Sequence, residues 1–135
     1  MKNLPKRIIH IEDKEDFKSK VKDSLASIPG LDIKQFNDLS SFIRVGHPDN
    51  EADLYILDRH FPDYKGILGD NLWNAISYIS FLNPENKVLV LTHSPPAERE
   101  WRRYPCVREV FSKLNFNPDM FRMSVSNYLE IGGSQ

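Results

Sequence analysis

The segment LYILD at residues 54–58 consists of four consecutive apolar residues followed directly by a carboxylate, Asp58. An apolar run of this length without alternation is typical of a central β-strand that is covered on both faces, as in a parallel sheet. A second run, VLVL at residues 88–91, has the same character and is followed by Thr92. Both runs therefore predict buried strands that end where polar side chains begin.

Similar apolar runs alternate along the chain with segments of helical period. The predicted strands cover residues 7–11, 31–36, 54–57, 88–91 and 107–111. Apolar side chains at helical spacing predict helices across residues 17–28, 39–43, 72–82 and 118–129, with a short polar helix at 97–103. Asn117 followed by Pro118 predicts the start of the last helix. This alternation predicts an α/β domain with a mostly parallel sheet.

Length and composition indicate one ordinary globular domain. The chain has 135 residues, of which 40% are hydrophobic and 27% charged, with a formal net charge of −1. We expect a single domain across residues 1–135, with its core at about residues 6–130. The near-neutral charge and the lack of a recognised DNA-binding motif argue against nucleic-acid binding.

Cys106 is the single cysteine of the chain. One cysteine forms no internal disulfide, which agrees with a reducing compartment, and its place before a predicted strand indicates a small core residue rather than a nucleophile. No apolar run approaches the roughly 20 residues that span a bilayer, and the basic first residues lack the apolar stretch of a signal peptide. We therefore expect a cytoplasmic protein without membrane attachment.

Charged and hydroxyl side chains follow the predicted strands. They are Glu12, Asp13, Asp58, Thr92 and Lys113. Because the carboxyl ends of parallel strands open on one edge of the sheet, we expect these side chains to converge. Neighbouring carboxylates repel one another unless a cation intervenes, and Mg²⁺ suits oxygen ligands. The cluster predicts magnesium-dependent phosphoryl chemistry in which an aspartate is the nucleophile.

Four pieces of the sequence resemble the motifs of bacterial response-regulator receiver domains, the CheY-like family. They are IIHIED at residues 8–13, DLYILD at 53–58 with Pro62, Asp63 and Gly66 beyond it, VLVLT at 88–92 and VFSK at 110–113. The resemblance extends from about Lys6 to Tyr128. It implies a flavodoxin-like fold of three layers: a five-stranded parallel sheet of order 2-1-3-4-5 with helices on both faces.

The resemblance also implies roles for the acidic residues. Asp58 would accept a phosphoryl group from a sensor histidine kinase or a phosphotransfer protein. Asp13, Asp58 and the backbone carbonyl of His60 would bind Mg²⁺, and Glu12 would complete the metal site by holding a coordinated water. Such a domain is a phosphoacceptor rather than an enzyme, and at most catalyses its own phosphorylation and dephosphorylation.

The hydroxyl and the amine at the other strand ends would act on the phosphoryl group. Thr92 would bond one phosphoryl oxygen and draw its loop inward, and Lys113 would pair with another. The added charge would then switch a loop and a surface between two states. The aromatic, arginine-rich segment from Ala97 to Tyr104 and the fifth strand are the expected contact surface for a downstream protein, where receivers commonly bind partners or dimerise.

Several positions depart from the receiver pattern. Leu114 follows Lys113 where the family usually has a proline in a cis peptide bond, so we expect a trans bond here. Val110 occupies the position of the family's switch aromatic, and Phe111 should point to the opposite face because side chains alternate along a strand. His93 stands where a small residue usually admits the phosphodonor, and the loop after the third strand is longer than usual. These changes would slow or alter phosphorylation.

Other functions agree with parts of the sequence. A degenerate receiver would keep the fold and bind proteins without phosphorylation. A phosphatase of the haloacid-dehalogenase kind, with an aspartyl-phosphate intermediate, would need a second acid two residues after Asp58, where the chain has His60. A zinc site made by His60, His93 and the acids has no thiolate or paired-histidine spacing to support it. His10, within the first predicted strand, is interpreted as structural.

Overall fold

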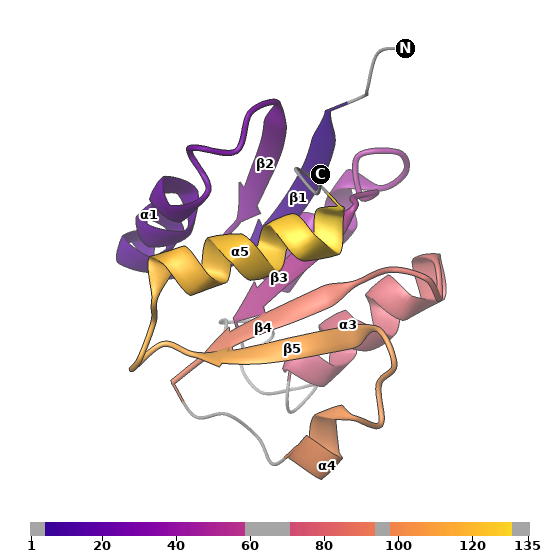
Figure 1. Ribbon diagram of the computed structural model, residues 1–135. Coiled ribbons are helices and arrows are strands. Elements are labelled where there is room, and N and C mark those ends of the chain that lie inside the picture. The colour runs from indigo at the N-terminus through magenta and orange to yellow at the C-terminus, as the bar shows by residue number, and fades with distance from the viewer. Residues whose placement is uncertain (1–4, 59–70, 94–97, 131–135) are drawn as a thin grey trace.

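Five strands form one parallel sheet in the order β2-β1-β3-β4-β5. The computed structural model describes residues 5–58, 71–93 and 98–130. In chain order the elements are β1 (Lys6–Ile11), α1 (Glu15–Ser24), β2 (Leu31–Phe36), α2 (Leu39–Val45), β3 (Leu54–Asp58), α3 (Asn71–Leu82), β4 (Val88–Thr92), α4 (Glu98–Trp101), β5 (Val107–Ser112) and α5 (Pro118–Leu129). The parallel sheet is the one that the alternating apolar runs predict, and its strand order is the one that the resemblance to receiver domains implies (Figure 1).

The strands β3 and β4 lie inside the sheet, and every residue of both is buried. Leu57 of β3 pairs with Ile11 of β1 on one side and with Val90 of β4 on the other. Each fully buried leucine or isoleucine stabilises the fold by about 1.5–3 kcal/mol. This register brings the carboxyl ends of β1, β3 and β4 to the same edge of the sheet.

Alternate side chains of the strands contribute to two apolar clusters, one on each face of the sheet. One cluster includes Phe42 of α2, Ile79 of α3 and Cys106, which is a small core residue as predicted. The other includes Val21 of α1 and Val125 of α5. Figure 1 shows α1 and α5 in front of the sheet and α3 behind it. The fold is therefore a three-layer α/β sandwich of the flavodoxin-like type.

The start of α5 is set by Asn117, as its sequence predicts. The Asn117 side-chain oxygen accepts a hydrogen bond from the backbone N–H of Met120 at 3.1 Å, and Pro118 occupies the first turn. Such a cap pairs an N–H group that the helix itself leaves unpaired, and it contributes about 1 kcal/mol.

The helix α1 is shorter than its apolar spacing predicts. It ends at Ser24, although the apolar stripe continues to Ile28. Leu25 leaves the helical conformation at ψ 1°, and its N–H bonds to the carbonyls of both Val21 and Lys22, as is common at a helix end. Leu25 and Ile28 are buried nevertheless. The turn after α1 thus supplies part of the apolar contact that the sequence assigns to a helix.

Two side chains on the apolar faces of their helices are not fully buried. Ile43 is 38% exposed because the short helix α2 turns only part of its surface toward the sheet. Tyr128 in α5 is half-buried, and its hydroxyl donates a hydrogen bond to Glu109 Oε1 at 3.1 Å. Its polar end therefore stays at the surface while its ring packs against the core.

The polar helix α4 covers four residues rather than the predicted 97–103, with Ala97 outside the described residues. The sequence there has few apolar positions that could hold a longer helix against the core. Three strands, in contrast, extend one residue further than predicted, to Asp58, Thr92 and Ser112. Within the described ranges, no helix is long and apolar enough to cross a membrane.

Candidate functional site

Three carboxylates meet at the carboxyl edge of the sheet. Glu12 and Asp13 follow β1, and Asp58 is the last residue of β3. Because β1 and β3 are paired neighbours, the ends of these strands bring the acids side by side. One carboxylate oxygen of each acid lies within 4.8 Å of the others. The structure therefore brings together the acidic residues on which the sequence analysis depends.

Lys113 supplies a buried ammonium group to these carboxylates. Its Nζ lies 2.8 Å from Glu12 Oε1, 3.0 Å from Glu12 Oε2 and 3.2 Å from Asp58 Oδ1. The aromatic ring of Phe17 in α1 covers the same ammonium group, with Nζ 4.6 Å from the ring centroid. Lys113 is only 6% exposed, so it is part of the acidic site rather than a solvated surface lysine.

The pKa of Glu12 is raised to about 7, mainly because the side chain is fully buried. The negative charge of Asp58 also raises this pKa, whereas the ammonium of Lys113 and the backbone N–H of Lys14, 3.2 Å from Glu12 Oε2, lower it. Three carboxylates thus face one ammonium group. When Glu12 is ionised, the cluster carries more negative than positive charge.

The donor atoms of this cluster suit a hard divalent cation such as Mg²⁺. In the described part of the chain, the cluster consists of carboxylates alone, and Mg²⁺ typically binds through one or two carboxylates together with water and phosphate oxygens. Asp13 Oδ1 is buried and has no hydrogen-bond partner among the described residues, so a bound cation would give it one. The residues fit the ion. The further predicted ligand, the carbonyl of His60, lies outside the described residues.

Thr92 and His93 lie at the end of β4. Thr92 is fully buried and pairs in register with Ser112 of β5. Its carbonyl accepts the backbone N–H of Lys113 at 2.8 Å, which ties the end of β4 to the residue that carries the ammonium group. His93 is exposed, its ring centroid lies 6.4 Å from that of Phe17, and it does not belong to the described carboxylate cluster. Among the described residues, His93 therefore gives no support to a zinc site, and His60 lies outside them.

The comparisons with known proteins concern the fold. No protein-family profile and no curated protein sequence matches the chain. The BeF3-activated receiver domain of DrrB from Thermotoga maritima aligns over 94% of this chain and 99% of its own, with a TM-score of 0.74 and 22% identity. A receiver domain of an HD-domain protein from Pseudomonas fluorescens Pf-5 aligns over 95% of this chain and 96% of its own, with a TM-score of 0.76 and 16% identity. The isolated receiver domain of RcsB from Salmonella enterica serovar Typhimurium aligns over 97% of this chain and 92% of its own, with a TM-score of 0.75 and 22% identity. The chain has the response-regulator receiver fold.

Within this receiver fold, the unusual residues of β5 and its exit are arranged as the sequence predicts. The peptide bond between Lys113 and Leu114 is trans. Val110 packs against the apolar cluster on the α3 side of the sheet, and Phe111 packs on the opposite side, where its ring centroid lies 5.3 Å from that of Phe121. On the α3 side of the sheet, the position of the family's switch aromatic therefore carries the aliphatic side chain of Val110.

Two contacts of the receiver site are not apparent from the sequence. The spacing of Phe17 marks it only as an apolar residue of α1, yet its ring covers the ammonium group of Lys113. His10, interpreted as structural, has its Nε2 4.0 Å from Glu12 Oε1. The one feature of the sequence that could have marked His10 as part of the site is its polar side chain inside an otherwise apolar strand. For Phe17 the sequence holds no such signal, because the contact depends on how α1 packs beside the end of β5.

Proposed function

We propose that this chain is a phosphoacceptor receiver: Asp58 takes a phosphoryl group from a histidine kinase or a phosphotransfer protein in a Mg²⁺-dependent reaction, and the domain signals through protein contacts. One observation carries the proposal. The buried Asp58 has a carboxylate oxygen within 4.8 Å of those of Glu12 and Asp13, and its Oδ1 lies 3.2 Å from Lys113 Nζ. This is a nucleophile with cation-binding acids on one side and a fixed ammonium group beside it.

The transfer step follows from the chemistry of a phosphohistidine donor. A carboxylate oxygen of Asp58 forms the new O–P bond while the P–N bond breaks, and the imidazole leaves with the electron pair. The attacking carboxylate must be ionised, and Lys113 Nζ at 3.2 Å offsets its charge. Asp13 and Asp58 would hold Mg²⁺, which would supply positive charge to offset that of the transferring oxygens.

Lys113 exchanges partners in this proposal. Its ammonium group is held by Glu12 and Asp58 in the structure, and a phosphoryl group on Asp58 offers it new anionic oxygens. The Thr92 hydroxyl donates to another phosphoryl oxygen. Because the backbone N–H of Lys113 bonds to the Thr92 carbonyl, the ends of β4 and β5 respond to the same charge.

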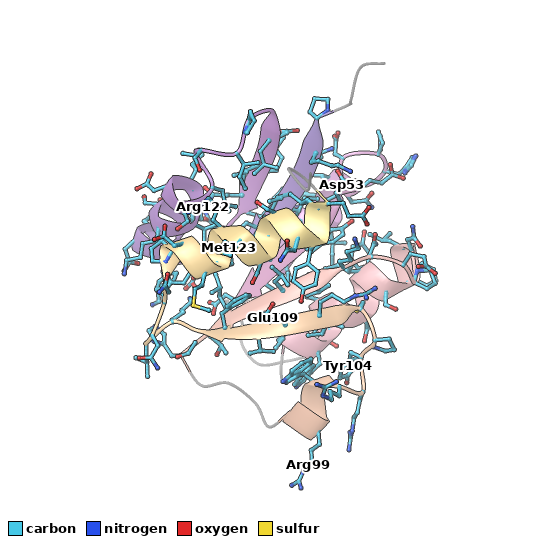
Figure 2. All side chains as sticks on the ribbon, in the orientation of Figure 1. Asp53, Arg99, Tyr104, Glu109, Arg122 and Met123 are labelled. Atoms are coloured by element: carbon cyan, nitrogen blue, oxygen red, sulfur yellow. The ribbon has the colours of Figure 1, made fainter. Side chains whose placement is uncertain are left out.

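The contact surface for a downstream protein lies around α4 and β5. Tyr104 stacks on Trp73 of α3, with ring centroids 4.9 Å apart and an interplanar angle of 16°, and Trp101 packs against the same core cluster. These aromatic side chains hold the segment against the fold. Arg99 is exposed and points away from the rest of the molecule at α4 (Figure 2). An acidic surface on a partner would complement it.

Two of the similar structures agree with a phosphorylation-dependent role. The DrrB domain is BeF3-activated, and the structure of the isolated RcsB domain is one in the presence of the phosphomimetic BeF3. In this chain, the same mimic is expected to bind at Asp58.

Intact-mass measurement after incubation with acetyl phosphate tests the proposal. The wild-type chain should gain one phosphoryl group in MgCl2 and none in excess EDTA. Asp58→Asn should remain unmodified, whereas Asp16→Asn, a matched change of an exposed aspartate in α1, should behave as the wild type. An unmodified wild type that binds Mg²⁺ would instead support a protein-binding module that works without phosphorylation. Turnover of a phosphomonoester that Asp58→Asn abolishes would indicate a phosphatase.

A further inference from the structure

A row of polar side chains runs from the half-buried Gln35 in β2 through the buried His10 in β1 to Glu12 at the acidic site. His10 and Gln35 are paired in register, with Gln35 Nε2 3.2 Å from His10 Nδ1. On its other side the His10 ring has Nε2 4.0 Å from Glu12 Oε1. His10 and Glu12 are both 0% exposed. The transfer step described above uses neither His10 nor Gln35.

The Gln35 amide determines which ring nitrogen of His10 carries the hydrogen. Gln35 Nε2 also donates to the backbone carbonyl of Lys18 at 3.0 Å, and a carbonyl only accepts, so the NH2 group of the amide must face this side. The same NH2 group faces Nδ1, which must therefore be the accepting, unprotonated nitrogen. The ring is thus neutral, with its hydrogen on Nε2.

The N–H group at His10 Nε2 lies near a carboxylate without bonding to it. Within the described part of the chain this atom has no hydrogen-bond partner, although it is fully buried. A buried donor without a partner is destabilising, and an apolar side chain would fill the same strand position without that cost. The separation of 4.0 Å from Glu12 Oε1 is about 1 Å longer than a hydrogen bond, so a small displacement of Glu12 toward the ring would form one.

We propose that His10 is a positioning residue for Glu12, and that Gln35 holds the imidazole so that its Nε2–H replaces Lys113 as the donor to Glu12. The replacement occurs when Lys113 turns to a phosphoryl oxygen, so this inference rests on the proposed function. Glu12 then keeps a donor and its place beside Asp13. Donors that orient the carboxylates of a metal site typically change metal affinity about 10–100-fold.

Nuclear magnetic resonance of the full ¹⁵N-labelled chain tests the first part of the inference. Long-range ¹H–¹⁵N spectra distinguish the two tautomers of a neutral histidine, and the signals of His10 are identified by their loss in His10→Leu. The metal-free wild type is expected to show the Nε2–H tautomer. The Nε2 proton is expected to shift downfield when MgCl2 and BeF3 are added together, because it then bonds to Glu12. A merely structural histidine would not show that shift.

Titration of the backbone amide signals with MgCl2 in the presence of BeF3, which gives Lys113 its phosphoryl-like partner, tests the second part and shows that each variant is folded. His10→Leu should weaken Mg²⁺ binding about tenfold. Gln35→Leu, on the edge strand β2, should do the same and replaces His10→Leu if that variant does not fold. The matched control is Ile8→Val, a buried change in the same strand that lies in the apolar cluster below α1 and α5, and it should bind as the wild type does.

The outcomes separate the two proposals. An Nδ1–H tautomer, or wild-type Mg²⁺ affinity in the folded variants, overturns the positioning role of His10 and leaves the proposed function intact. A wild-type chain that binds no Mg²⁺ overturns the proposed function, and this inference fails with it.

Discussion

Lys113 and Glu12 form a buried ion pair between residues that lie 101 positions apart in the sequence, with Nζ 2.8 Å from Oε1 and 3.0 Å from Oε2. The two side chains are 1% and 0% exposed. Asp58 Oδ1 shares the same ammonium group at 3.2 Å. The ammonium group of Lys113 therefore links Glu12 to Asp58, the proposed phosphoacceptor, and the energetics of the site can be measured without any ligand.

Removing the ammonium group should destabilise the fold strongly. Lys113→Met leaves two buried carboxylates without their cation, and such a loss costs about 3–5 kcal/mol. Urea denaturation at pH 8 measures it, with Lys20→Met as the control, because exposed Lys20 also lies over the Phe17 ring, at 4.8 Å from its centroid. The control should change stability by about 0.5 kcal/mol or less. Equal losses in the two variants would contradict a buried, paired Lys113.

Glu12 and His10 should give opposite pH dependences of stability. The pKa of Glu12 is raised from 4.5 to about 7, so the folded state keeps a proton that the unfolded state has lost, and this contribution to stability falls as pH rises through that interval. The pKa of His10 is lowered from 6.5 to about 3, so its contribution falls as pH drops below 6.5. Between pH 4.5 and 6.5 the contribution of Glu12 to the free energy of unfolding falls with pH while that of His10 rises, so the two contributions cancel in the wild type.

Single variants should reveal the pH dependence of stability that each residue contributes. Relative to the wild type, Glu12→Gln should make stability rise with pH between 4.5 and 6.5, and His10→Leu should make it fall, each by about 1.4 kcal/mol per pH unit. Urea denaturation of the three proteins across this interval measures the difference. Parallel curves for all three would show that neither pKa is shifted as burial predicts.

Mg²⁺ should raise the melting temperature. A ligand that binds only the folded state stabilises it by RT ln(1 + [L]/Kd), which is about 2.7 kcal/mol at a hundredfold excess over Kd. Millimolar MgCl2 should therefore shift the transition of the wild type, and NaCl of the same ionic strength should not. Asp13→Asn should lose the shift because it removes a ligand. A midpoint that MgCl2 leaves unchanged would count against the metal site.

The ring of Phe17 should be coupled energetically to Lys113. A ring that covers a desolvated ammonium group contributes about 0.5–2 kcal/mol beyond its apolar contacts. In a double-mutant cycle, Phe17→Leu should therefore cost less in a Lys113→Met background than in the wild type. Phe121→Leu is the matched change, because Phe121 is also buried and no described lysine or arginine lies over its ring, and it should cost the same in both backgrounds. A coupling energy of zero between Phe17 and Lys113 would mean that the ring contributes only apolar packing.

The fold and the convergence of the acids could be predicted because they depend on local and periodic features. The apolar runs at residues 54–57 of β3 and 88–91 of β4 identify central strands of a parallel sheet, and the parallel direction alone brings Asp13 and Asp58 to one edge. The cap at Asn117 follows from one residue and its neighbour.

The partners of the buried side chains could not be predicted, because they depend on tertiary packing. The sequence associates Lys113 with a phosphoryl oxygen, but not with Glu12, which is closer to it than Asp58 is. Burial is the main cause of the raised pKa of Glu12, and burial is a property of the whole sheet edge. The early end of α1 at Ser24 also depends on how the following turn packs on the sheet.

The site of phosphorylation is the most direct measurement. The wild-type chain is incubated with acetyl phosphate and MgCl2, and sodium borohydride then reduces any aspartyl phosphate to homoserine, which tandem mass spectrometry locates. We predict homoserine at position 58 alone, and none when EDTA replaces MgCl2. Homoserine at another aspartate, or none in a folded chain that binds Mg²⁺, would contradict the assignment of Asp58 as the phosphoacceptor.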